Sequence, residues 1–515
     1  MMIDFSSFNT ERIGMETIYI LTLFSLLLLL CICSSKLSTW IKMPVLIVFL
    51  GVGMLIDLPK ESLDTENISL ANWIGTIAMV YILFYGGFDT KWSSVKKVAF
   101  RGILLSTLGV LLSALFVGLF TYGFLKWQYP DNYIPISLCL LLGSIVSSTD
   151  AAAVFSVLRS KSVSLGGQLS PLLELESGSN DPMAALMTIM LVPIAIEETK
   201  AGRMPVFSVL ITNLVKDFFF KMTLGIVIGF IWGKIAAWLF NRSDFEYDGL
   251  YYVLGVATAL FAYSGTEALQ GNGFMAVYVC GLAMGNSKFI YHNGLGRFLG
   301  GVSWLMQVIL FCMLGMLCTP SQVWYVRETV VVALFLMVIA RPLAVFICMI
   351  GSKFNYRERT LISWVGLRGG APIMLATFPW ASNLQDHDLL FHVVFFIVLT
   401  SVVLQGTTIM PLAKLLKLDK PLKIHPKIPL EFENTGNLDG ETREFEILAG
   451  SKFIGMRLAE LGLPKGALVL LIRREGGFII PHGNVQILEN DSLMVLGTEQ
   501  ILSEAGKVLG VAEEE

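Results

Sequence analysis

The sequence predicts a polytopic α-helical membrane protein that ends in a small soluble α+β domain, and three observations support this prediction. The chain has 515 residues, of which 55% are hydrophobic and only 15% are charged. Apolar runs of about 20 residues, the length of a transmembrane helix, recur along most of it. Near the C-terminal end these runs stop, and alternating apolar and polar residues between turn signals indicate strands.

The hydropathy pattern predicts about thirteen transmembrane spans. They lie near residues 17–35, 43–58, 70–88, 99–125, 134–158, 170–196, 217–240, 250–268, 272–286, 298–318, 328–350, 360–380 and 390–413. The first span follows acidic residues and no small-residue cleavage site comes after it. We therefore expect it to be retained and not removed as a signal peptide.

Basic residues predict the orientation of the spans, because Lys and Arg accumulate in cytoplasmic loops. Alternate loops carry the basic residues Lys36, Lys42, Lys91, Lys96, Lys97, Arg101, Arg159, Lys161, Lys288, Arg297, Lys353, Arg357 and Arg359. The opposite loops are acidic, and only the acidic loop at 241–249 argues the other way. The N-terminus is therefore predicted outside and the C-terminus in the cytosol.

Composition also predicts the domain boundaries. Residues 1–415 form the predicted membrane domain, 416–441 form a linker with prolines and charges, and 442–515 form the soluble domain, where GG and PHG mark turns. All seven cysteines lie in or beside apolar spans. We expect them to be reduced packing residues that form neither a disulfide framework nor a metal site.

Four ionisable residues inside the spans are candidates for function, because charge at membrane depth is costly unless it is paired or hydrated. They are Asp150, Glu176, Asp181 and Arg341. Asp150 ends the run GSIVSSTD, whose small hydroxylated residues would by themselves equally suit close helix packing. With an acid in the same turn, a broken helix that offers oxygens to an ion becomes the better interpretation.

The next span contains LLELESGSNDPMAAL. In a helix, Ser177 and Asp181 are four residues apart, as are Glu176 and Asn180, so these polar groups can project toward one side. Pro182 removes a helical donor, which leaves either an extra free carbonyl oxygen or a kink near the acid. Hard monovalent cations prefer such oxygen ligands. The cluster is therefore a candidate cation site, with a purely structural role as the alternative.

Two arginines lie in late spans. Arg341 needs a buried carboxylate, and Glu176 or Glu174 is the expected partner. Arg368 lies in WVGLRGGAPIML, where glycines and a proline predict a second broken helix. Two interrupted spans, one in each half of the chain, are typical of an inverted-repeat transporter whose binding site lies at the bilayer midplane.

The motifs SSTDAAAVF, ESGSNDP, IARPLAV and GLRGGAP, in that order, resemble the monovalent cation/proton antiporters of the Na⁺/H⁺ exchanger (NhaP-type) family. This resemblance covers about residues 17–415, and the tail from about 443 resembles a TrkA-C (RCK-C) regulatory domain. Together they resemble bacterial K⁺/H⁺ antiporters that serve pH homeostasis and cell-volume regulation. The resemblance implies the cytoplasmic (inner) membrane, a homodimer, the substrates K⁺, Na⁺ and H⁺, and no nucleic-acid partner.

The resemblance also implies roles for residues in the membrane domain. The cation and proton site would consist of Asp181, Asn180, Asp150, Thr149 and Ser177. Within it, Asp181 would be protonated and cation-bound in turn, and Thr149 would contribute its backbone. Glu176 and Arg341 would form a structural ion pair. Arg368 would offset the partial charges at the half-helix ends, at the point where the two broken helices cross. The Asn-Asp form of the motif implies electroneutral exchange of one cation for one proton.

The tail is expected to regulate transport. By resemblance, such domains pair across a two-fold axis, and some bind cyclic di-AMP or another adenine nucleotide. Arg473, Arg474 and His482 would be the candidate phosphate contacts. The tail has Glu-Asn-Asp at 489–491 where the family commonly has a Gly-Asp turn, so the identity of the ligand stays open, as does a simple folding or dimerisation role.

Other functional classes fit less well. The sequence lacks a nucleotide-hydrolysis motif and a dinucleotide fingerprint, which predicts secondary transport, no resident cofactor and no enzyme activity. A cation channel would need a TVGYG-like filter, and an intramembrane hydrolase would need a Ser-His pair; the sequence offers neither. A Na⁺ or Li⁺/H⁺ antiporter stays the main alternative, because the preference for K⁺ rests on the attached tail.

Overall fold

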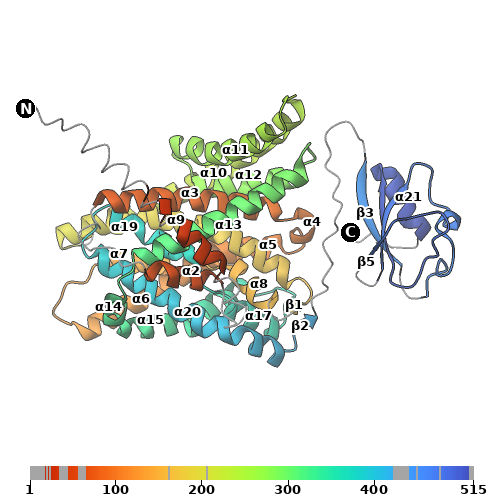
Figure 1. Ribbon diagram of the computed structural model, residues 1–515. Coiled ribbons are helices and arrows are strands. Elements are labelled where there is room, and N and C mark those ends of the chain that lie inside the picture. Colours follow the sequence, from red (N-terminus) through yellow and green to blue (C-terminus); the bar gives the residue numbers. More distant parts are fainter. Residues whose placement is uncertain are drawn as a thin grey trace, which may run out of the picture. The chain divides into compact units, whose positions relative to one another are not determined.

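The computed structural model describes residues 18, 21–22, 25–33, 45–55, 65–159, 163–203, 207–421, 440–447, 450–474 and 477–509. The helices of the membrane part are labelled in Figure 1. Of the predicted span 17–35, residues 18, 21–22 and 25–33 are described, whereas most of the predicted linker lies outside the described residues.

Seven helical segments in the described part are long and apolar enough to cross a bilayer, which makes this a multi-pass membrane protein. They are Ile68–Asp89, Ala99–Gln128, Leu169–Ala201, Leu214–Arg242, His292–Met316, Arg327–Cys348 and His387–Leu415. Three shorter apolar helices accompany them: α2 (Val45–Met54), α7 (Ile136–Ile145) and α12 (Gly273–Gly285). The predicted helical membrane fold is confirmed, whereas the number of thirteen spans stays a prediction.

The helix α10 (Phe207–Arg242) is longer than the span predicted at 217–240. The charged pair Lys216 and Asp217 interrupts the apolar run, so hydropathy alone starts the span after it. The backbone nevertheless stays helical through both residues, because Lys and Asp in a helix cost little where their side chains are exposed.

Two helices are broken, as predicted from their small and polar residues. The first consists of α7 and α8 (Ala151–Arg159), separated by residues 146–150. The second consists of α17 (Tyr356–Trp364) and α18 (Gly370–Leu375), separated by residues 365–369 and followed by α19 (Thr377–Ala381). In the first break Ser and Thr side chains compete for backbone hydrogen bonds, and in the second glycines lower the cost of leaving the helix.

Each broken helix belongs to a structural repeat. The first repeat comprises α5 (Ala99–Leu104), the π-helical turn η2 (Leu105–Gly109), α6 (Val110–Gln128), α7, α8 and α9 (Leu169–Ala201). The second comprises α15 (Val330–Phe335), the π-helical turn η4 (Leu336–Ala340), α16 (Arg341–Cys348), α17 to α19 and α20 (His387–Leu415). The predicted spans place the repeats in opposite directions across the bilayer, since the second repeat begins seven spans after the first.

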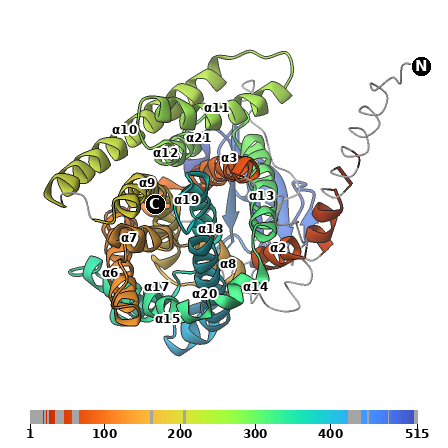
Figure 2. The ribbon, with the colours of Figure 1, turned by 90° about the vertical axis from the view of Figure 1, so that its left-hand side faces the viewer.

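Glycines allow some helix pairs to pack backbone against backbone. A Cβ atom added to Gly281 of α12 would lie 2.2 Å from the carbonyl oxygen of Phe84 in α3 (Thr65–Asp89), and one added to Gly229 of α10 would lie 2.3 Å from that of Ala276 in α12. In the first repeat, a Cβ on Gly143 of α7 would lie 2.2 Å from the carbonyl oxygen of Ala114 in α6. Figure 2 shows α6 beside α7 and α12 beside α3.

The membrane helices named so far can be grouped into two blocks. The scaffold block contains α3, α10 and α12, together with the similarly packed pair of α2 and α13 (His292–Met316). The repeat block contains the two repeats and therefore both broken helices. A side chain larger than hydrogen at the shared glycines would separate the backbones, so each block is expected to hold together tightly.

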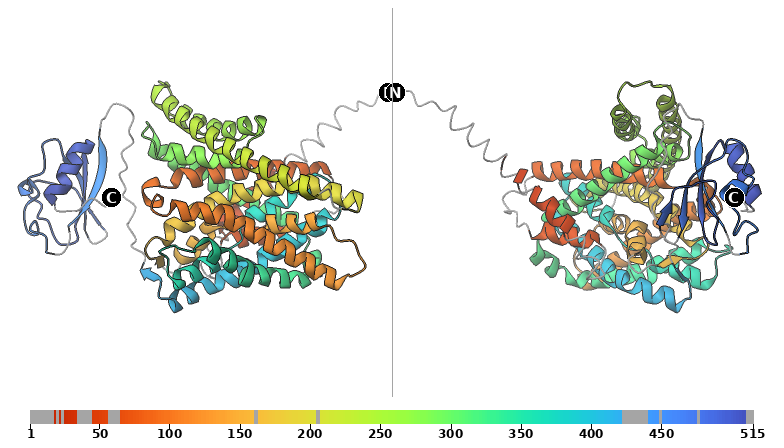
Figure 3. Two further views of the ribbon diagram at one scale, coloured as in Figure 1. Left: turned by 180° about the vertical axis from the view of Figure 1, so that it is seen from behind. Right: turned by 45° about the vertical axis from the view of Figure 1, so that its right-hand side comes forward.

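The C-terminal domain is a four-stranded antiparallel sheet with one helix, α21 (Glu499–Leu509), packed on it (Figure 3). The strands follow the order β3-β6-β4-β5, with β3 at Glu441–Glu446, β6 at Ser492–Gly497, β4 at Leu468–Arg474 and β5 at Gly477–Ile479. Its buried core includes Phe445, Ile472, Leu493 and Leu502. The prediction of a small α+β domain is confirmed.

The described residues of the membrane part include a two-stranded sheet. Strand β1 (Val163–Leu165), which follows α8, pairs with β2 (Asp419–Pro421), which follows α20. The first residues of the predicted linker are therefore hydrogen-bonded to the membrane part.

All seven cysteines are free thiols, and six of them are buried.

Candidate functional site

The two helix breaks cross in direct contact. The backbone N–H of Asp150 donates a hydrogen bond to the carbonyl oxygen of Leu367, at 2.7 Å. A Cβ atom on Gly369 would lie 2.3 Å from a carboxylate oxygen of Asp150, and one on Gly366 would lie 3.2 Å from the side chain of Thr149. Gly369 therefore has no room for a side chain because the first break lies against it, and Gly366 is packed tightly between the first break and Arg341.

Arg368 binds the carboxyl end of the first half-helix. Its guanidinium nitrogen Nη1 donates to the carbonyl oxygens of Ser147 and Ser148, at 2.7 and 2.6 Å, just beyond the end of α7. The side chain is fully buried. A cation at this place offsets the negative end of the helix dipole and satisfies carbonyls that the break leaves without helical donors.

Asp150 lies at the amino end of the other half-helix. One of its carboxylate oxygens, Oδ1, accepts a hydrogen bond of 3.0 Å from the backbone N–H of Ala153, so Asp150 caps α8. The other oxygen faces Gly369, immediately before α18 begins at Gly370. This carboxylate therefore lies near the positive ends of two half-helix dipoles.

Helix α9 carries the residues that face the first break, and it continues without interruption through Pro182. The hydroxyl of Ser177 donates to the carbonyl oxygen of Thr149 at 3.0 Å and accepts from the N–H of Ala151 at 2.9 Å. The carboxylate of Asp181 accepts a hydrogen bond from the hydroxyl of Ser148.

Asn180 contributes a buried oxygen that has no hydrogen-bond partner among the described residues. Its amide nitrogen donates to the hydroxyl of Thr149, whereas its Oδ1 atom is left without a donor. Burying such an acceptor is costly unless a hydrogen-bond donor or a cation interacts with it. Asp181 and Asp150 are half-buried and close enough to interact electrostatically. The arrangement can supply a small cation with carboxylate and neutral oxygens.

The buried ion pair joins the two repeats. Arg341, at the start of α16, binds the carboxylate of Glu176 on α9, and each side chain is only 1% exposed. Of the two partners that the sequence left open, Glu174 and Glu176, the structure thus places Glu176 against the guanidinium. A buried pair of this kind neutralises both charges and leaves neither available to a mobile ion.

Comparison with known proteins places this arrangement in a family. The description "Sodium/hydrogen exchanger, transmembrane" matches residues 25–415, and "TrkA-C domain" matches residues 442–510. The chain belongs to the sodium/hydrogen exchanger family. The exchanger is 34% identical to the K(+)/H(+) antiporter NhaP of Alkalimonas amylolytica, over 94% of this chain and 82% of that protein.

Further relatives and a solved structure agree with this assignment. The K(+)/H(+) antiporter NhaP2 of Shewanella baltica is 33% identical over 95% of this chain and 83% of that protein. The Na(+)/H(+) antiporter 1 of Methanocaldococcus jannaschii is 27% identical over 73% of this chain and 86% of that protein. The solved structure of the sodium proton antiporter MjNhaP1 from that organism matches with a TM-score of 0.65 and 24% identity, over 79% of this chain and 100% of that one. This last likeness supports the fold, and the predicted resemblance is confirmed.

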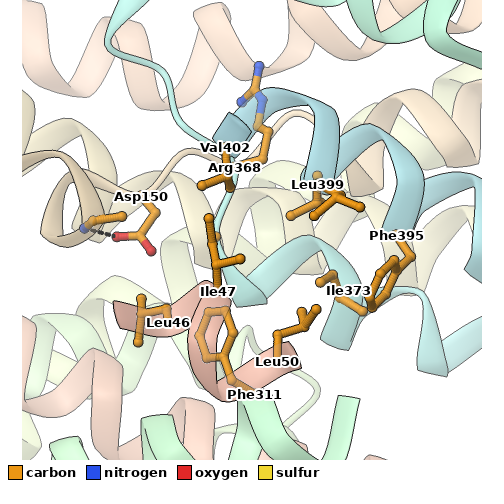
Figure 4. Close-up of a pocket in the computed structure, with 13 residues that line it drawn as sticks. Leu46, Ile47, Leu50, Asp150, Phe311, Arg368, Ile373, Phe395, Leu399 and Val402 are labelled. Atoms are coloured by element: carbon orange, nitrogen blue, oxygen red, sulfur yellow. Dashed lines mark hydrogen bonds between the residues drawn. The ribbon is translucent and has the colours of Figure 1, made fainter. Parts of the chain in front are cut away.

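A small cavity in the exchanger lies beside Asp150 (Figure 4). Its volume of about 20 Å³ is enough for a single water molecule. Asp150 lines one side together with Arg368 and Gly369, and apolar residues of α2, α13, α18 and α20 line the rest. In Figure 4 the carboxylate of Asp150 lies toward the cavity, whereas the guanidinium of Arg368 extends away from it. The surface of the cavity is almost entirely apolar, so the cavity adjoins the helix breaks without offering polar groups to an ion or a water molecule.

Sequence reasoning missed two residues that support the second break. The side-chain amide of Gln405, on α20, donates to the carbonyl oxygen of Trp364 at the end of α17, at 2.9 Å. Its Oε1 atom accepts from the hydroxyl of Ser401 at 2.5 Å, and Ser401 accepts from the N–H of Arg368 at 3.3 Å. The only signal for them in the sequence is weak, because they are two of several polar residues in the predicted span 390–413.

In the TrkA-C domain, the candidate ligand residues have protein partners. Arg474 forms two hydrogen bonds of 2.9 Å with the buried carboxylate of Asp491, and Arg473 pairs with Glu444 at 2.7 Å. His482 is exposed in the loop after β5. Asn490, just before Asp491, has a φ of 65°, so it occupies the left-handed conformation for which the family's turn commonly has glycine.

Proposed function

We propose that this exchanger transports K⁺ in exchange for H⁺, with Na⁺ as the alternative substrate, and that the two ions compete for Asp181. One observation above all supports this: the charges around the crossing are otherwise balanced within the protein. Glu176 is paired with Arg341, Arg368 faces the carbonyl end of α7, and Asp150 faces half-helix amino ends. Asp181 has a hydroxyl partner in Ser148 and stays the acid available to a mobile ion.

The proposed site consists of Asp181, Asn180, Asp150, Thr149 and Ser177. Asp181 would bind the cation directly, the free Oδ1 of Asn180 would be a neutral ligand, and Asp150 would contribute directly or through a water. Ser177 holds the backbone of Thr149 and Ala151 in place. No group of three His, Cys, Asp or Glu side chains in the described part could hold a metal ion, which favours a monovalent over a multivalent substrate.

Electroneutral exchange follows from this charge balance. Asp181 is neutralised by one proton or by one monovalent cation, so the loaded site has the same net charge in both states. A site without a bound ion would expose an uncompensated carboxylate to the apolar interior, which makes its movement unfavourable. The transport of the cation is then coupled to that of the proton without any further residue, because only a site neutralised by one of them moves across the membrane.

The preference for K⁺ is supported by the names of the two bacterial relatives and by the TrkA-C domain, whereas the archaeal relative is a Na⁺/H⁺ antiporter. We also propose a homodimer in the bacterial inner membrane, with the N-terminus outside and the TrkA-C domain in the cytosol. Cyclic di-AMP or an adenine nucleotide would regulate it through Arg473, Arg474 and His482. Because both arginines are already ion-paired, ligand binding would have to compete with Glu444 and Asp491.

The test is cation-evoked proton flux in proteoliposomes that hold a pH gradient, with K⁺, Na⁺ and Li⁺ compared. Asp181→Asn should abolish the flux, and Asp131→Asn, in an exposed loop, should leave it unchanged. The cation that dissipates the gradient at the lowest concentration is the substrate. Flux that persists in Asp181→Asn would overturn the assignment of the site, and cation flux without proton movement would favour a channel.

A further inference from the structure

Helix α12 of the scaffold block contacts the binding helix α9 on both sides of Asp181. The ring of Tyr278 lies on Gly178, where an added Cβ atom would be 2.5 Å from a ring carbon. The side-chain amide of Asn272 donates to the carbonyl oxygen of Pro182, the residue after Asp181, at 3.0 Å. These two contacts bracket the carboxylate to which the proposed substrate ions bind.

Asn272 uses all its polar groups and is only 3% exposed. Its Oδ1 atom accepts from the N–H of Met275 at 3.2 Å and so caps the start of α12. Its backbone N–H donates to the carbonyl oxygen of Lys221 in α10, at 3.0 Å. The residue is therefore fixed in the scaffold block, and only its side-chain NH₂ group reaches across to the repeat block.

The contacts at this boundary differ in kind from those inside the scaffold. Within the scaffold, α12 meets α3 and α10 through glycines that bring backbones together. Across the boundary, α12 meets α9 through a ring and a side-chain amide. A similar side-chain hydrogen bond of 2.9 Å joins Asn72 of α3 to Thr377 of α19. Side-chain contacts can be broken and remade without separating packed backbones, so this boundary is where the blocks can slide.

Alternating access in inverted-repeat transporters requires one block to move against the other around the bound ion. We propose that Asn272 is a positioning residue and a latch: its hydrogen bond to Pro182 holds α9 in the present conformation and must break before the loaded site moves. The inference rests on the proposed antiport. The latch acts on α9 next to Asp181, yet it touches neither the carboxylate nor the ion.

A latch that exists in one conformation only has a distinctive kinetic signature. Its loss lowers the population of that conformation relative to the other by about fivefold, the effect of one ordinary hydrogen bond. The apparent affinity for the cation then falls at the membrane face to which this conformation opens and rises at the other. Damage to the binding site itself would weaken binding from both faces alike. The diagnostic quantity is therefore the ratio of the two half-saturating cation concentrations.

The experiment measures this ratio for the full-length exchanger in oriented vesicles, with K⁺ added to either face at a fixed pH. Asn272→Ser keeps an oxygen that can cap α12 but is too short to reach Pro182, and it should shift the ratio by about fivefold. Asn286→Ser is the matched control, because Asn286, at the other end of α12, bonds to Thr90 and Trp92 on the α3 side of the scaffold. The control should leave the ratio unchanged.

A second variant covers the case in which Asn272→Ser folds poorly. Asn272→Asp also keeps the capping oxygen, but it places a carboxylate oxygen against the carbonyl of Pro182 and should shift the ratio in the same direction. An unchanged ratio in either folded variant would overturn the latch. If the wild type transports no cation, the proposed function fails first, so the two failures are distinguishable.

Discussion

The two repeats share a backbone plan but carry opposite charges. Each has a helix with a π-helical turn, a broken helix and a long helix. The first repeat supplies the acids near the crossing, Asp150, Glu176 and Asp181, whereas the second supplies the cations, Arg341 and Arg368. Three carboxylates against two guanidiniums leave one negative charge. An inverted repeat can therefore be symmetric in shape and complementary in charge, with one negative charge that remains for a mobile ion to neutralise.

The two breaks also differ in how their carboxyl ends are stabilised. The end of α7 receives the guanidinium of Arg368 from the other repeat. The end of α17 receives the neutral amide of Gln405 from within its own repeat. A second cation in place of that amide would cancel the remaining negative charge, so the neutral amide is consistent with the charge balance that the proposed exchange requires.

The ion pair between the repeats gives the largest expected effect. Arg341→Ala should leave Glu176 as an uncompensated buried charge and lower the free energy of unfolding by about 3–5 kcal/mol. Thermal unfolding of the purified protein in detergent measures this. Removing both charges, in Glu176→Leu with Arg341→Leu, should recover part of the loss, and Arg327→Ala on the surface should have little effect. A single variant as stable as the double one would break the assignment of complementary charge to the repeats.

The negative charges of Asp150 and Asp181 at the crossing predict that removing one of them changes the pH dependence of transport. Asp150→Asn removes a negative charge beside Asp181, so Asp181 should lose its proton more readily. The pH of half-maximal K⁺-evoked flux should move by about one unit in the acid direction. A pH series on the reconstituted variant measures it, with Asp131→Asn as the neutral control. An alkaline shift would mean that Asp150 matters more as a cation ligand than through its charge, and no shift in a variant that still binds K⁺ would mean that its charge does not act on Asp181.

The sequence predicted the parts of the site that depend on local chemistry. Hydroxylated residues before Asp150 and glycines around Arg368 indicated the broken helices, because these residue types destabilise a helix wherever they occur. The four-residue spacing correctly placed Ser177 and Asp181 on one side of a helix. These inferences need only the geometry of a single segment.

The partners across the bundle could not be predicted in this way. Glu174 and Glu176 are both compatible with a pair to Arg341, and only the rotation of α9 against α16 decides between them. Asn272 and Gln405 each lie among other polar residues, and no pattern in the sequence shows that these two cap or cross to distant elements. Tertiary packing gives them their roles, so the latch and the support of the second break required the structure.

Substitution of Gln405 should have the smallest effect of these variants on stability. It tests whether the neutral amide at the end of α17 matters as the guanidinium at the end of α7 does. Gln405→Met keeps a similar volume but removes the donor to Trp364 and the acceptor for Ser401, which should cost about 1–3 kcal/mol of stability. Thermal unfolding should show this loss, and Gln307→Met on α13, whose amide lies 3.5 Å from Ser303, should not. Because Ser401 also holds the backbone of Arg368, K⁺ flux should weaken together with stability. If stability falls while flux per folded molecule stays the same, the second break serves only as a support, and the first repeat alone determines ion binding.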